Sequence, residues 1–390
     1  RIKMEFEYWW LLALPLFFTL GWIAARVDIN QLLSESTTLP AAYFKGLNFL
    51  ITDQHDKAIE AFIEAVEANA DSLELHFALG SLFRRRGEVD RAIHLHLNLL
   101  EKRELPEPQK MAVTAELAQD YLKAGLLDRA EELFKSLDDS RYKQPALRAL
   151  LEIYVREREW EHAIESAKEL ERLSGVPFRK EIAQYYCEMA MKSILTNDHH
   201  TARHELEKAL DANKGCVRAN ILLGDMEAAD GAHKVAISIW KRVEFQKPEY
   251  LGLIAGKLLA SYRAIGKLDE GMAQLRNYLQ TYKLPSLQAV VYEAVLTEEG
   301  PESAAALARE ELNKKPSLQT LDQLLKARMQ FEKNDQQDTN LTQQTVRSAI
   351  GNRNAFVCDQ CGFRAKNFHW QCPACNAWEA IAPEPNEPNT

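Results

Sequence analysis

The chain has 390 residues, and its 57 acidic and 48 basic side chains give it a formal net charge of −9. This acidic balance argues against a dedicated nucleic-acid binder, because such proteins bind largely by neutralising phosphate charges. The 16 glycines and 14 prolines are too few for a low-complexity or all-β chain of this length, and the central part is rich in Ala, Leu, Glu, Lys and Arg. The composition therefore predicts an all-α protein, long enough for two or three domains.

A short tail, residues 1–7, precedes a stretch that is predicted to cross a membrane. Tyr8–Ala25 contains 18 residues without a charge, and a helix of this length spans ~27 Å, about one hydrocarbon core. A cleaved signal peptide is the alternative, but its cleavage site needs small residues at positions −3 and −1. Trp22 or Ile23 would occupy position −3. We therefore predict a retained transmembrane helix over residues 8–25.

The orientation of this helix follows from the charges beside it. If the protein starts at Met4, the cation nearest to the span is Arg26, on the side of the main domain. The positive-inside rule then places the main domain in the cytoplasm. Cysteines that stay reduced and bind metal indicate the same compartment.

Residues 40–316 repeat themselves with a period near 34 residues. Small residues recur at steps of 34, 38, 33, 39, 34, 35 and 34 residues. These small residues are Ala58, Ala92, Ala130, Ala163, Ala202, Ala236, Gly271 and Ala305. Such a period, with small residues at points of close packing, is typical of tetratricopeptide repeats. The sequence predicts about eight helix pairs that stack into a superhelical solenoid.

Two further repeat positions agree with this assignment. Residues twelve before the small residue are mostly small themselves, and residues four after it are mostly bulky. The first set is Gly46, Gly80, Ala118, Leu151, Ala190, Gly224, Leu259 and Glu293. The second set is Phe62, His96, Phe134, Ala167, Leu206, Trp240, Leu275 and Arg309. The eighth unit matches the pattern least well.

The turns inside the pairs have a conformational signature. Five residues before the small residue stand Gly87, Gly125, Gly231 and Gly266, with Asn197 at the same place. Gly and Asn accept the left-handed conformation that ends a helix, so each unit is predicted to be two antiparallel helices. A stack of such units offers a long concave face that binds peptides or proteins rather than performing chemistry.

Residues 317–351 are predicted to be a helical and polar linker, because Asn334–Thr345 is almost entirely polar and only a weak helical pattern continues to Ile350. Residues 381–390 are rich in Pro and polar side chains and offer little to bury, so a disordered tail is predicted there.

Between these segments, residues 356–380 hold two Cys-x-x-Cys pairs that predict a metal-binding domain. The pairs are Cys358 with Cys361 and Cys372 with Cys375, and ten residues separate them. Four thiolates in a tetrahedron suit zinc or iron. Disulfides would suit a small secreted protein instead. Gly362 follows the first pair and lets backbone N–H groups turn toward sulfur.

The identity of the metal is open between zinc and iron. Cys-x-x-Cys-Gly with Cys-Pro-x-Cys is similar to the iron-binding knuckles of rubredoxins, but Asn376 stands where rubredoxins usually have a second glycine, and the spacer is shorter than theirs. The site is predicted to be rubredoxin-like or zinc-ribbon-like, structural and closed, with all four positions filled by sulfur.

Other candidate sites are weaker. The motifs of nucleotide-binding loops, zinc proteases and serine hydrolases are absent from the sequence, so no catalytic residue and no enzyme activity are predicted. Cys187 and Cys216 are interpreted as separate buried packing residues. The Arg84–Arg86 cluster is interpreted as charge complementation at a helix C-terminus, with an acidic partner segment as the alternative. The aromatic residues of the cysteine domain are expected to pack it and to be able to dock it on the repeats.

Over nearly the whole chain the sequence resembles the lipopolysaccharide assembly protein B family of Gram-negative inner membranes. The order of one anchor, a tetratricopeptide array and a rubredoxin-like domain carries this resemblance, together with specific segments. These are GLNFLITDQHDKA at Gly46–Ala58, LFRRRGEVDRAI at Leu82–Ile93, YLKAGLLDRAE at Tyr121–Glu131, and CDQCGF and WQCPACNAW in the cysteine domain. All four family cysteines are present.

The resemblance implies a single-pass inner-membrane protein whose repeats face the cytoplasm. Members of the family promote degradation of the lipid A deacetylase by a membrane-bound AAA+ protease, and so regulate lipopolysaccharide synthesis. The implied partners are that protease, the deacetylase and other proteins of lipopolysaccharide synthesis and transport. The competing hypothesis is a rubredoxin-like electron-transfer protein, which leaves the repeats without a role. Nucleic-acid binding is disfavoured by the net charge of −9.

Overall fold

The computed structural model describes residues 41–102, 104–137, 140–331, 336–351 and 356–384, together with Thr19. The predicted tail 1–7 and the predicted membrane helix 8–25 lie outside the described residues, Thr19 apart. Within the ranges above, no helix combines the length and apolar character needed to cross a membrane. The chain forms two compact units, with the boundary in the sequence between Ile153 and Tyr154.

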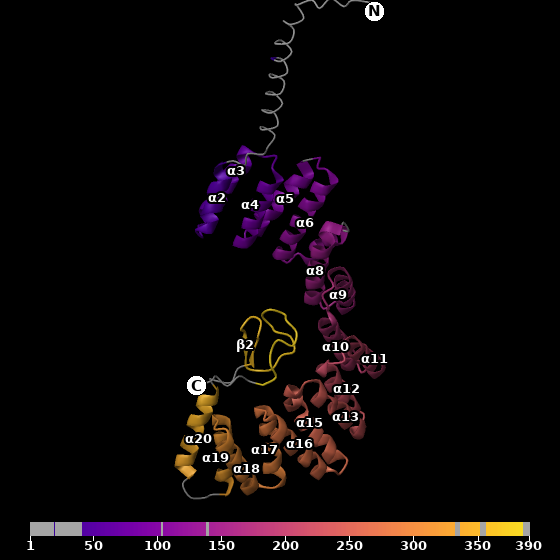
Figure 1. The fold of residues 1–390 in the computed structure, drawn as a ribbon, viewed down its shortest axis with the longest axis vertical. Helices are drawn as coiled ribbons and strands as arrows, with labels where there is room; N and C mark the ends of the chain where they lie inside the picture. Colours follow the sequence, from indigo (N-terminus) through magenta and orange to yellow (C-terminus); the bar gives the residue numbers. More distant parts are fainter. Residues whose placement is uncertain are drawn as a thin grey trace, which may run out of the picture. The chain divides into compact units, whose positions relative to one another are not determined.

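The first unit consists of successive helix–turn–helix pairs, drawn from indigo to magenta in Figure 1. Its helices are α2 (Ala41–Ile51), α3 (His55–Ala68), α4 (Leu73–Arg86), α5 (Val89–Lys102), α6 (Glu107–Ala124) and α7 (Leu127–Ser136), and α8 (Ser140–Glu157) runs across the boundary. Each helix packs on the next as far as α7, as expected for tetratricopeptide repeats.

The second unit continues the same arrangement and ends in the small cysteine domain (Figure 1). Its helices are α9 (Trp160–Ser174), α10 (Arg179–Leu195), α11 (His199–Ala212), α12 (Val217–Ala229), α13 (His233–Trp240), α14 (Arg242–Gln246), the short η1 (Pro248–Tyr250), α15 (Leu251–Ala264), α16 (Leu268–Tyr282), α17 (Pro285–Glu298), α18 (Pro301–Lys314), α19 (Leu318–Phe331) and α20 (Gln336–Gly351). Each of the eight predicted repeats corresponds to a pair of helices.

The predicted repeat positions meet inside the pairs. In three of the pairs, a glycine of the first helix lies against the ring sixteen positions later in the second helix; these are Gly46 with Phe62, Gly80 with His96 and Gly224 with Trp240. A Cβ added at Gly224 would lie 2.2 Å from Nε1 of Trp240, and one added at Gly80 would lie 2.4 Å from Cε1 of His96. Real Cβ atoms do not approach so closely, so glycine is needed where the two helices touch. The predicted turns are confirmed as well, because Gly87, Gly125, Gly231, Gly266 and Asn197 all have positive φ.

Residues 317–351 are helical over Leu318–Phe331 and Gln336–Gly351, as predicted, but they are not a linker. Helix α19 packs on α18, and α20 packs on α19, so this segment forms a further helix pair of the array. The hydroxyl of Tyr292 donates a hydrogen bond to the carbonyl of Gln323 at 2.7 Å, and Ala327 and Val346 are buried. The polar composition of α20 concealed this pair because α20 covers one end of the stack, where only one side of the helix needs apolar residues.

The cysteine domain contains a two-stranded antiparallel sheet of β1 (Phe356–Val357) and β2 (Arg364–Ala365). Its fold extends past the predicted end at residue 380. Ile381 forms a bridge with Cys358 and is buried, and Pro383 is also buried. The prediction of a disordered tail from residue 381 is therefore wrong for residues 381–384, whereas residues 385–390 lie outside the described residues.

Candidate metal centre

The two Cys-x-x-Cys pairs form two turns of equal backbone geometry. In the first, the N–H of Gly362 donates to the carbonyl of Cys358 at 2.9 Å, and in the second the N–H of Asn376 donates to the carbonyl of Cys372 at 2.9 Å. Gly362 has φ 73° and Asn376 has φ 58°. Asn is among the few residues that tolerate this left-handed conformation. Asn376 therefore adopts the backbone conformation that the second glycine has in rubredoxins. The turn keeps its geometry although Asn replaces Gly at this position.

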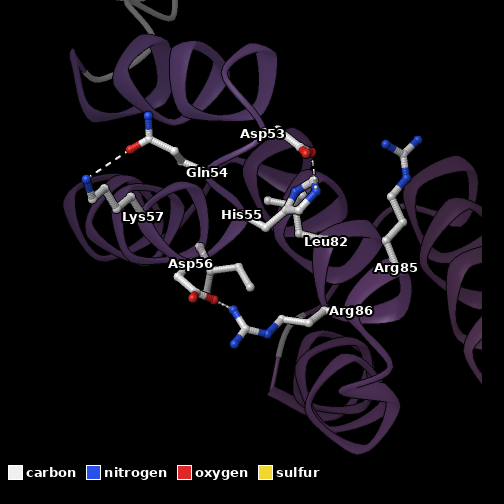
Figure 2. Close-up of a pocket in the computed structure, with 9 residues that line it drawn as sticks. Asp53, Gln54, His55, Asp56, Lys57, Leu82, Arg85 and Arg86 are labelled. Atoms are coloured by element: carbon white, nitrogen blue, oxygen red, sulfur yellow. Dashed lines mark hydrogen bonds and ion pairs between the residues drawn. The ribbon is translucent and has the colours of Figure 1, made fainter.

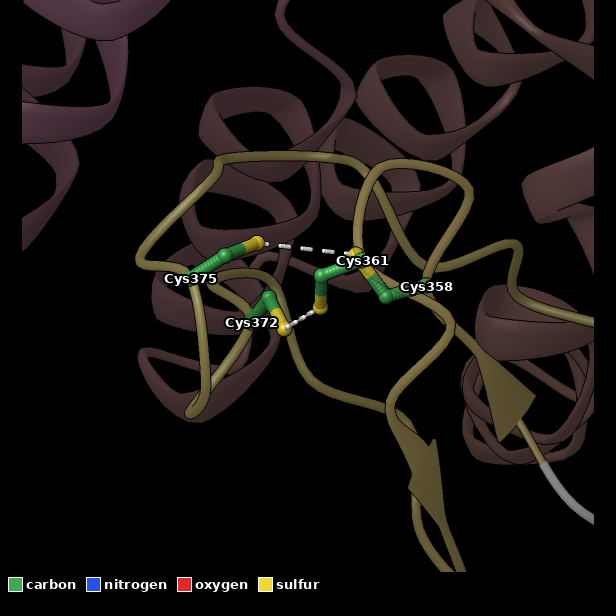
Figure 3. Close-up of side chains that lie close together, drawn as sticks. All are labelled: Cys358, Cys361, Cys372 and Cys375. Carbon is green, nitrogen blue, oxygen red and sulfur yellow. Dashed lines mark hydrogen bonds between the residues drawn. The ribbon is translucent and has the colours of Figure 1, made fainter. Parts of the chain in front are cut away.

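These turns bring the four predicted ligands together (Figure 3). All four Sγ atoms lie within 4.8 Å of one another. The Sγ atoms of Cys358 and Cys375 are 3.7 Å apart, as are those of Cys361 and Cys372. Four sulfur atoms placed ~2.3 Å from a central zinc ion in a tetrahedron lie ~3.8 Å from one another. The sulfur positions thus fit one tetrahedral metal ion.

The backbone also favours the thiolate form of one of the four ligands, Cys358. N–H groups of the first turn, that of Cys361 foremost, point at the Cys358 sulfur and lower the pKa of this thiol to about 7. A lower pKa favours the thiolate, which is the form that binds metal. Cys358 and Cys372 are buried, whereas Cys361 and Cys375 are exposed. A bound ion would cross-link the two turns and stabilise the domain, because four sulfur ligands leave no position for a substrate.

Aromatic rings of the cysteine domain pack against the repeats of the second unit. The ring of Trp370 stacks on Tyr250 at 5.3 Å between centroids and 6° between planes. The ring of Trp378 meets Tyr185 of α10 edge to face at 6.2 Å. The guanidinium of Arg218, at the start of α12, lies 6.0 Å from the Trp370 ring and 5.7 Å from the Trp378 ring. The expectation that these aromatic residues dock the domain on the repeats is confirmed.

The buried carboxylate of Glu379 also stabilises the contact between the cysteine domain and the repeats. The Glu379 side chain is only 3% exposed and forms an ion pair with Lys247. Its other oxygen accepts a hydrogen bond of 2.7 Å from the side-chain amide of Gln184. Gln184 in turn accepts from Arg218, and Arg218 donates to Glu188 at 2.7 Å. A continuous polar network therefore links the cysteine domain to α10, α12 and the turn before η1.

The end of the described chain makes a further attachment at α17. Both the backbone N–H and the hydroxyl of Ser286, in the first turn of α17, donate to the carboxylate of Glu384. A helix N-terminus favours negative charge because its first N–H groups have no partner within the helix. Burial, the largest influence, nevertheless raises the pKa of Glu384. We call the surface formed by Trp370, Trp378, Glu379 and Glu384 the docking face.

Glu379 and Glu384 were not predicted as functional residues. Neither residue belongs to a motif, and each acts through a partner more than 90 positions away in the chain. Glu379 has φ 50°, a strained value for a residue with a side chain. No motif indicates that value, which belongs to a turn inside the cysteine domain, where the N–H of Glu379 donates to the carbonyl of Trp370 at 2.7 Å.

A separate groove lies in the first unit, between the α2–α3 turn and the end of α4 (Figure 2). It has a volume of about 530 Å³ and contains both acidic and basic side chains. Asp56 pairs with Arg86, and Asp53 pairs with His55 at 2.9 Å. Because these charges largely compensate one another, the groove has no clear preference for an anion or a cation.

The three arginines of the cluster Arg84–Arg86 have different surroundings. Arg84 pairs with the buried Asp120 at 2.6 Å and with Glu116 on α6, so it joins neighbouring repeats. Arg86 pairs with Asp56 and Glu88. Arg85 makes no ion pair with any residue that the structure describes. The ion pairs of Arg84 between repeats were not predicted, because Asp120 lies 36 positions after Arg84 in the chain.

Comparison with known proteins agrees with both parts of this architecture. A family model described as "Rubredoxin metal binding domain" matches residues 356–383, and one described as "Tetratricopeptide repeat" matches residues 45–106 and 196–249. The chain is 31% identical over 380 residues to "Lipopolysaccharide assembly protein B" of Escherichia coli strain K12, covering 95% of this chain and 97% of that protein.

The protein of the same name from Haemophilus influenzae is 30% identical over 392 residues, covering 96% of this chain and 98% of that protein. Among solved structures, "MamA 41-end from Desulfovibrio magneticus RS-1" is 16% identical, with a TM-score of 0.33, over 46% of this chain and 99% of that chain. A score this low adds nothing to the fold assignment, which rests on the helix pairs and the family models.

Proposed function

Because the chain belongs to the lipopolysaccharide assembly protein B family, we propose that it is a non-catalytic adaptor that regulates lipopolysaccharide synthesis. In this proposal it promotes proteolysis of the lipid A deacetylase by a membrane AAA+ protease. It also scaffolds other proteins of lipopolysaccharide synthesis and transport. The names of the relatives support the connection with lipopolysaccharide, and the tetratricopeptide repeats support binding of proteins.

The observation that carries the proposal is the docking face. Glu379 and the rings of Trp370 and Trp378 contact α10, α12 and η1, so several repeats and the cysteine domain form one composite surface. The metal site stabilises the fold of the cysteine domain, and the repeats on which this domain docks are of a type that binds proteins. This combination suits a scaffold protein. Four sulfur ligands suit structural stabilisation of that surface.

The proposed location is the inner membrane, with a single helix over residues 8–25 and the repeats in the cytoplasm. The support is the uncharged sequence of that segment, with Arg26 following it. An anchor confines the scaffold to the surface on which its protease works, and confinement raises effective concentration without any new contact.

Electron transfer through an iron–thiolate centre is less well supported. That role leaves the long repeat array unexplained, whereas the adaptor role uses both the array and the domain docked on it. Metal analysis together with visible absorption separates the two metals, and a redox partner would be needed for the electron-transfer role.

The adaptor proposal is tested by depleting the protein and following the deacetylase after protein synthesis is blocked. We expect a higher deacetylase level and slower turnover, both restored by the full chain. Deleting residues 1–25 should act like depletion, and a variant with those residues replaced by an unrelated membrane helix is the matched control. Unchanged turnover in depleted cells would refute the proposal.

The location is tested separately. The protein should stay in the membrane pellet after an alkaline carbonate wash, and a reporter fused after Thr390 should behave as cytoplasmic. Release into the supernatant, or a periplasmic reporter signal, would contradict the proposed anchor.

A further inference from the structure

Two cysteines outside the metal centre lie in contact directly beneath the docking face. Cys187 belongs to α10, and Cys216 is the residue that precedes the first turn of α12. Their Sγ atoms are 3.8 Å apart, and both residues are fully buried. Both cysteines are buried packing residues as predicted, but they are not separate from each other. The two helices that carry them are neighbours in the array, which the 29-residue separation did not indicate.

The two sulfur atoms have different chemical environments. The side-chain amide of Gln184 approaches the Cys216 sulfur at 3.7 Å. Hydrogen bonding from Cys187 is the main cause that lowers the pKa of Cys216, and the N–H of Ala219 and the charge of Arg218 act in the same direction. Burial raises the pKa of Cys187. The pair thus combines a sulfur whose pKa is lowered, at the start of a helix, with a neighbouring thiol 3.8 Å away, as in reactive dithiols.

Gln184 connects this pair to the docked domain. Its side-chain nitrogen lies 3.7 Å from the Cys216 sulfur and 2.7 Å from a carboxylate oxygen of Glu379. Gln184 is itself fully buried, and Arg218, which donates to it, is 8% exposed. The Arg218 guanidinium lies near the rings of Trp370 and Trp378. The docking face therefore lies over the route by which a small molecule would reach Cys216 from this side.

We propose that Cys187 and Cys216 form a thiol–disulfide exchange site that the docked cysteine domain protects from oxidation. The oxidant is a low-molecular-weight disulfide. The Cys216 thiolate attacks one of its sulfur atoms, forms a mixed disulfide and releases one thiolate. The Cys187 thiol, after losing its proton to water, then attacks the Cys216 sulfur, which forms the Cys187–Cys216 bond and releases the second thiolate. One small disulfide is reduced to two thiols for each bond formed in the protein.

The same contacts make the coupling reciprocal. Forming the bond removes the thiolate that accepts from Gln184 and moves the Cys216 sulfur toward Cys187. Gln184 then loses one of the two partners that orient its amide toward Glu379. Because Gln184 contacts both Cys216 and Glu379, the dithiol–disulfide equilibrium and the docking equilibrium are linked, and each changes the other by the same factor. The redox state of Cys187 and Cys216 thereby changes how tightly the cysteine domain docks on the repeats. This inference does not depend on the identity of the adaptor's partners.

The test uses the full, metal-loaded chain incubated with glutathione disulfide. After quenching and alkylation, mass spectrometry measures the cross-linked peptide that contains Cys187 and Cys216, and the metal-ligand cysteines are followed on their own peptides. In the doubly substituted variant Trp370→Ala, Glu379→Gln, the cross-link should form at least about 30-fold faster than in the wild type, because the Glu379 change alone is expected to weaken docking by about 2 kcal/mol. Lys247→Ala removes the partner of Glu379 on the repeat side. It should also weaken docking and speed up formation of the Cys187–Cys216 cross-link.

Single cysteine variants identify the order of the steps. Cys187→Ser should accumulate a stable glutathione adduct on Cys216, and Cys216→Ser should give neither adduct nor cross-link at position 187. Circular dichroism checks that each variant keeps its helices. Equal cross-linking rates in the wild type and in both docking variants would overturn the protection, and no cross-link in any folded variant would overturn the site.

A second measurement, on the wild-type sequence, examines whether the Cys187–Cys216 cross-link weakens docking of the cysteine domain. Protein carrying the Cys187–Cys216 cross-link, with its metal content verified, should be cut by protease within residues 356–384 about tenfold faster than reduced protein. Dithiothreitol should restore resistance. Equal protease sensitivity of the two forms would overturn the coupling between the cysteine pair and docking.

Discussion

Replacing Glu379 by Gln removes one negative charge from the docking face and keeps the shape of the side chain. In the wild type this carboxylate is 3% exposed and accepts from both Gln184 and Lys247. In the variant, the amide oxygen can still accept from Gln184, but the amide nitrogen would face the Lys247 ammonium. Docking of the cysteine domain should therefore weaken, while the metal centre and the repeats stay folded.

The expected loss of docking free energy depends on how exposed the side chains of Glu379 and Lys247 are. Hydrogen bonds to charged groups contribute about 1.5–3 kcal/mol. The Lys247 side chain is 35% exposed, so it can turn to water instead of remaining unpaired. We therefore expect a loss of about 2 kcal/mol, which corresponds to a roughly 30-fold larger undocked fraction.

The assay is limited proteolysis and hydrogen exchange of residues 356–384 in the full, metal-loaded chain. Asp359→Asn is the control, because it makes the same charge change at an exposed position of the same domain. The variant Lys247→Met completes a double-mutant cycle, in which Glu379 and Lys247 should show a coupling of about 1–2 kcal/mol. Unchanged exchange in Glu379→Gln, or a coupling near zero, would refute the electrostatic account of docking.

Three further predictions concern the metal centre and the repeats. Cys358→Ser or Cys375→Ser should lose the metal, which supplies ~10 kcal/mol or more in structural sites, and should make the domain protease-sensitive while far-UV circular dichroism retains most of the helical signal. Asn376→Gly should melt close to the wild type, whereas Asn376→Val should lower the stability of the metal-loaded domain by about 1–2 kcal/mol, because φ is 58° there. Gly224→Ala should lower the melting temperature, because its Cβ would lie 2.2 Å from a buried indole and such overpacking costs about 1–3 kcal/mol. The matched change Gly256→Ala, where no atom lies within 4 Å, should not lower it, and equal melting of the two glycine variants would contradict the close-packing argument.

Features that depend on local chemistry could be predicted from the sequence. The Cys-x-x-Cys spacing determined the ligand set, and the glycines of the repeat turns determined where helices end, because both depend on residues within one turn of the chain. The pairing of Gly224 with Trp240 was also readable, since the repeat period places the two positions on facing helices.

Features that depend on distant contacts could not be predicted in the same way. The contact between Glu379 and Gln184 joins residues 195 positions apart, and it exists only because the cysteine domain lies on α10 and α12. The proximity of Cys187 and Cys216 depends on the packing of neighbouring repeats. Helix α20 was mistaken for part of a linker because a terminal helix of a stack is mostly solvated, so its sequence is polar.

Degradation of the deacetylase in a reconstituted membrane tests the adaptor proposal most directly. Vesicles containing the AAA+ protease and the lipid A deacetylase would receive the full, metal-loaded chain, the Glu379→Gln variant or no addition, and loss of the deacetylase would be followed over time. The account predicts faster degradation with the wild-type chain than with none, and an intermediate rate with the variant. The same rate with and without the chain, at saturating amounts of folded protein, would contradict it.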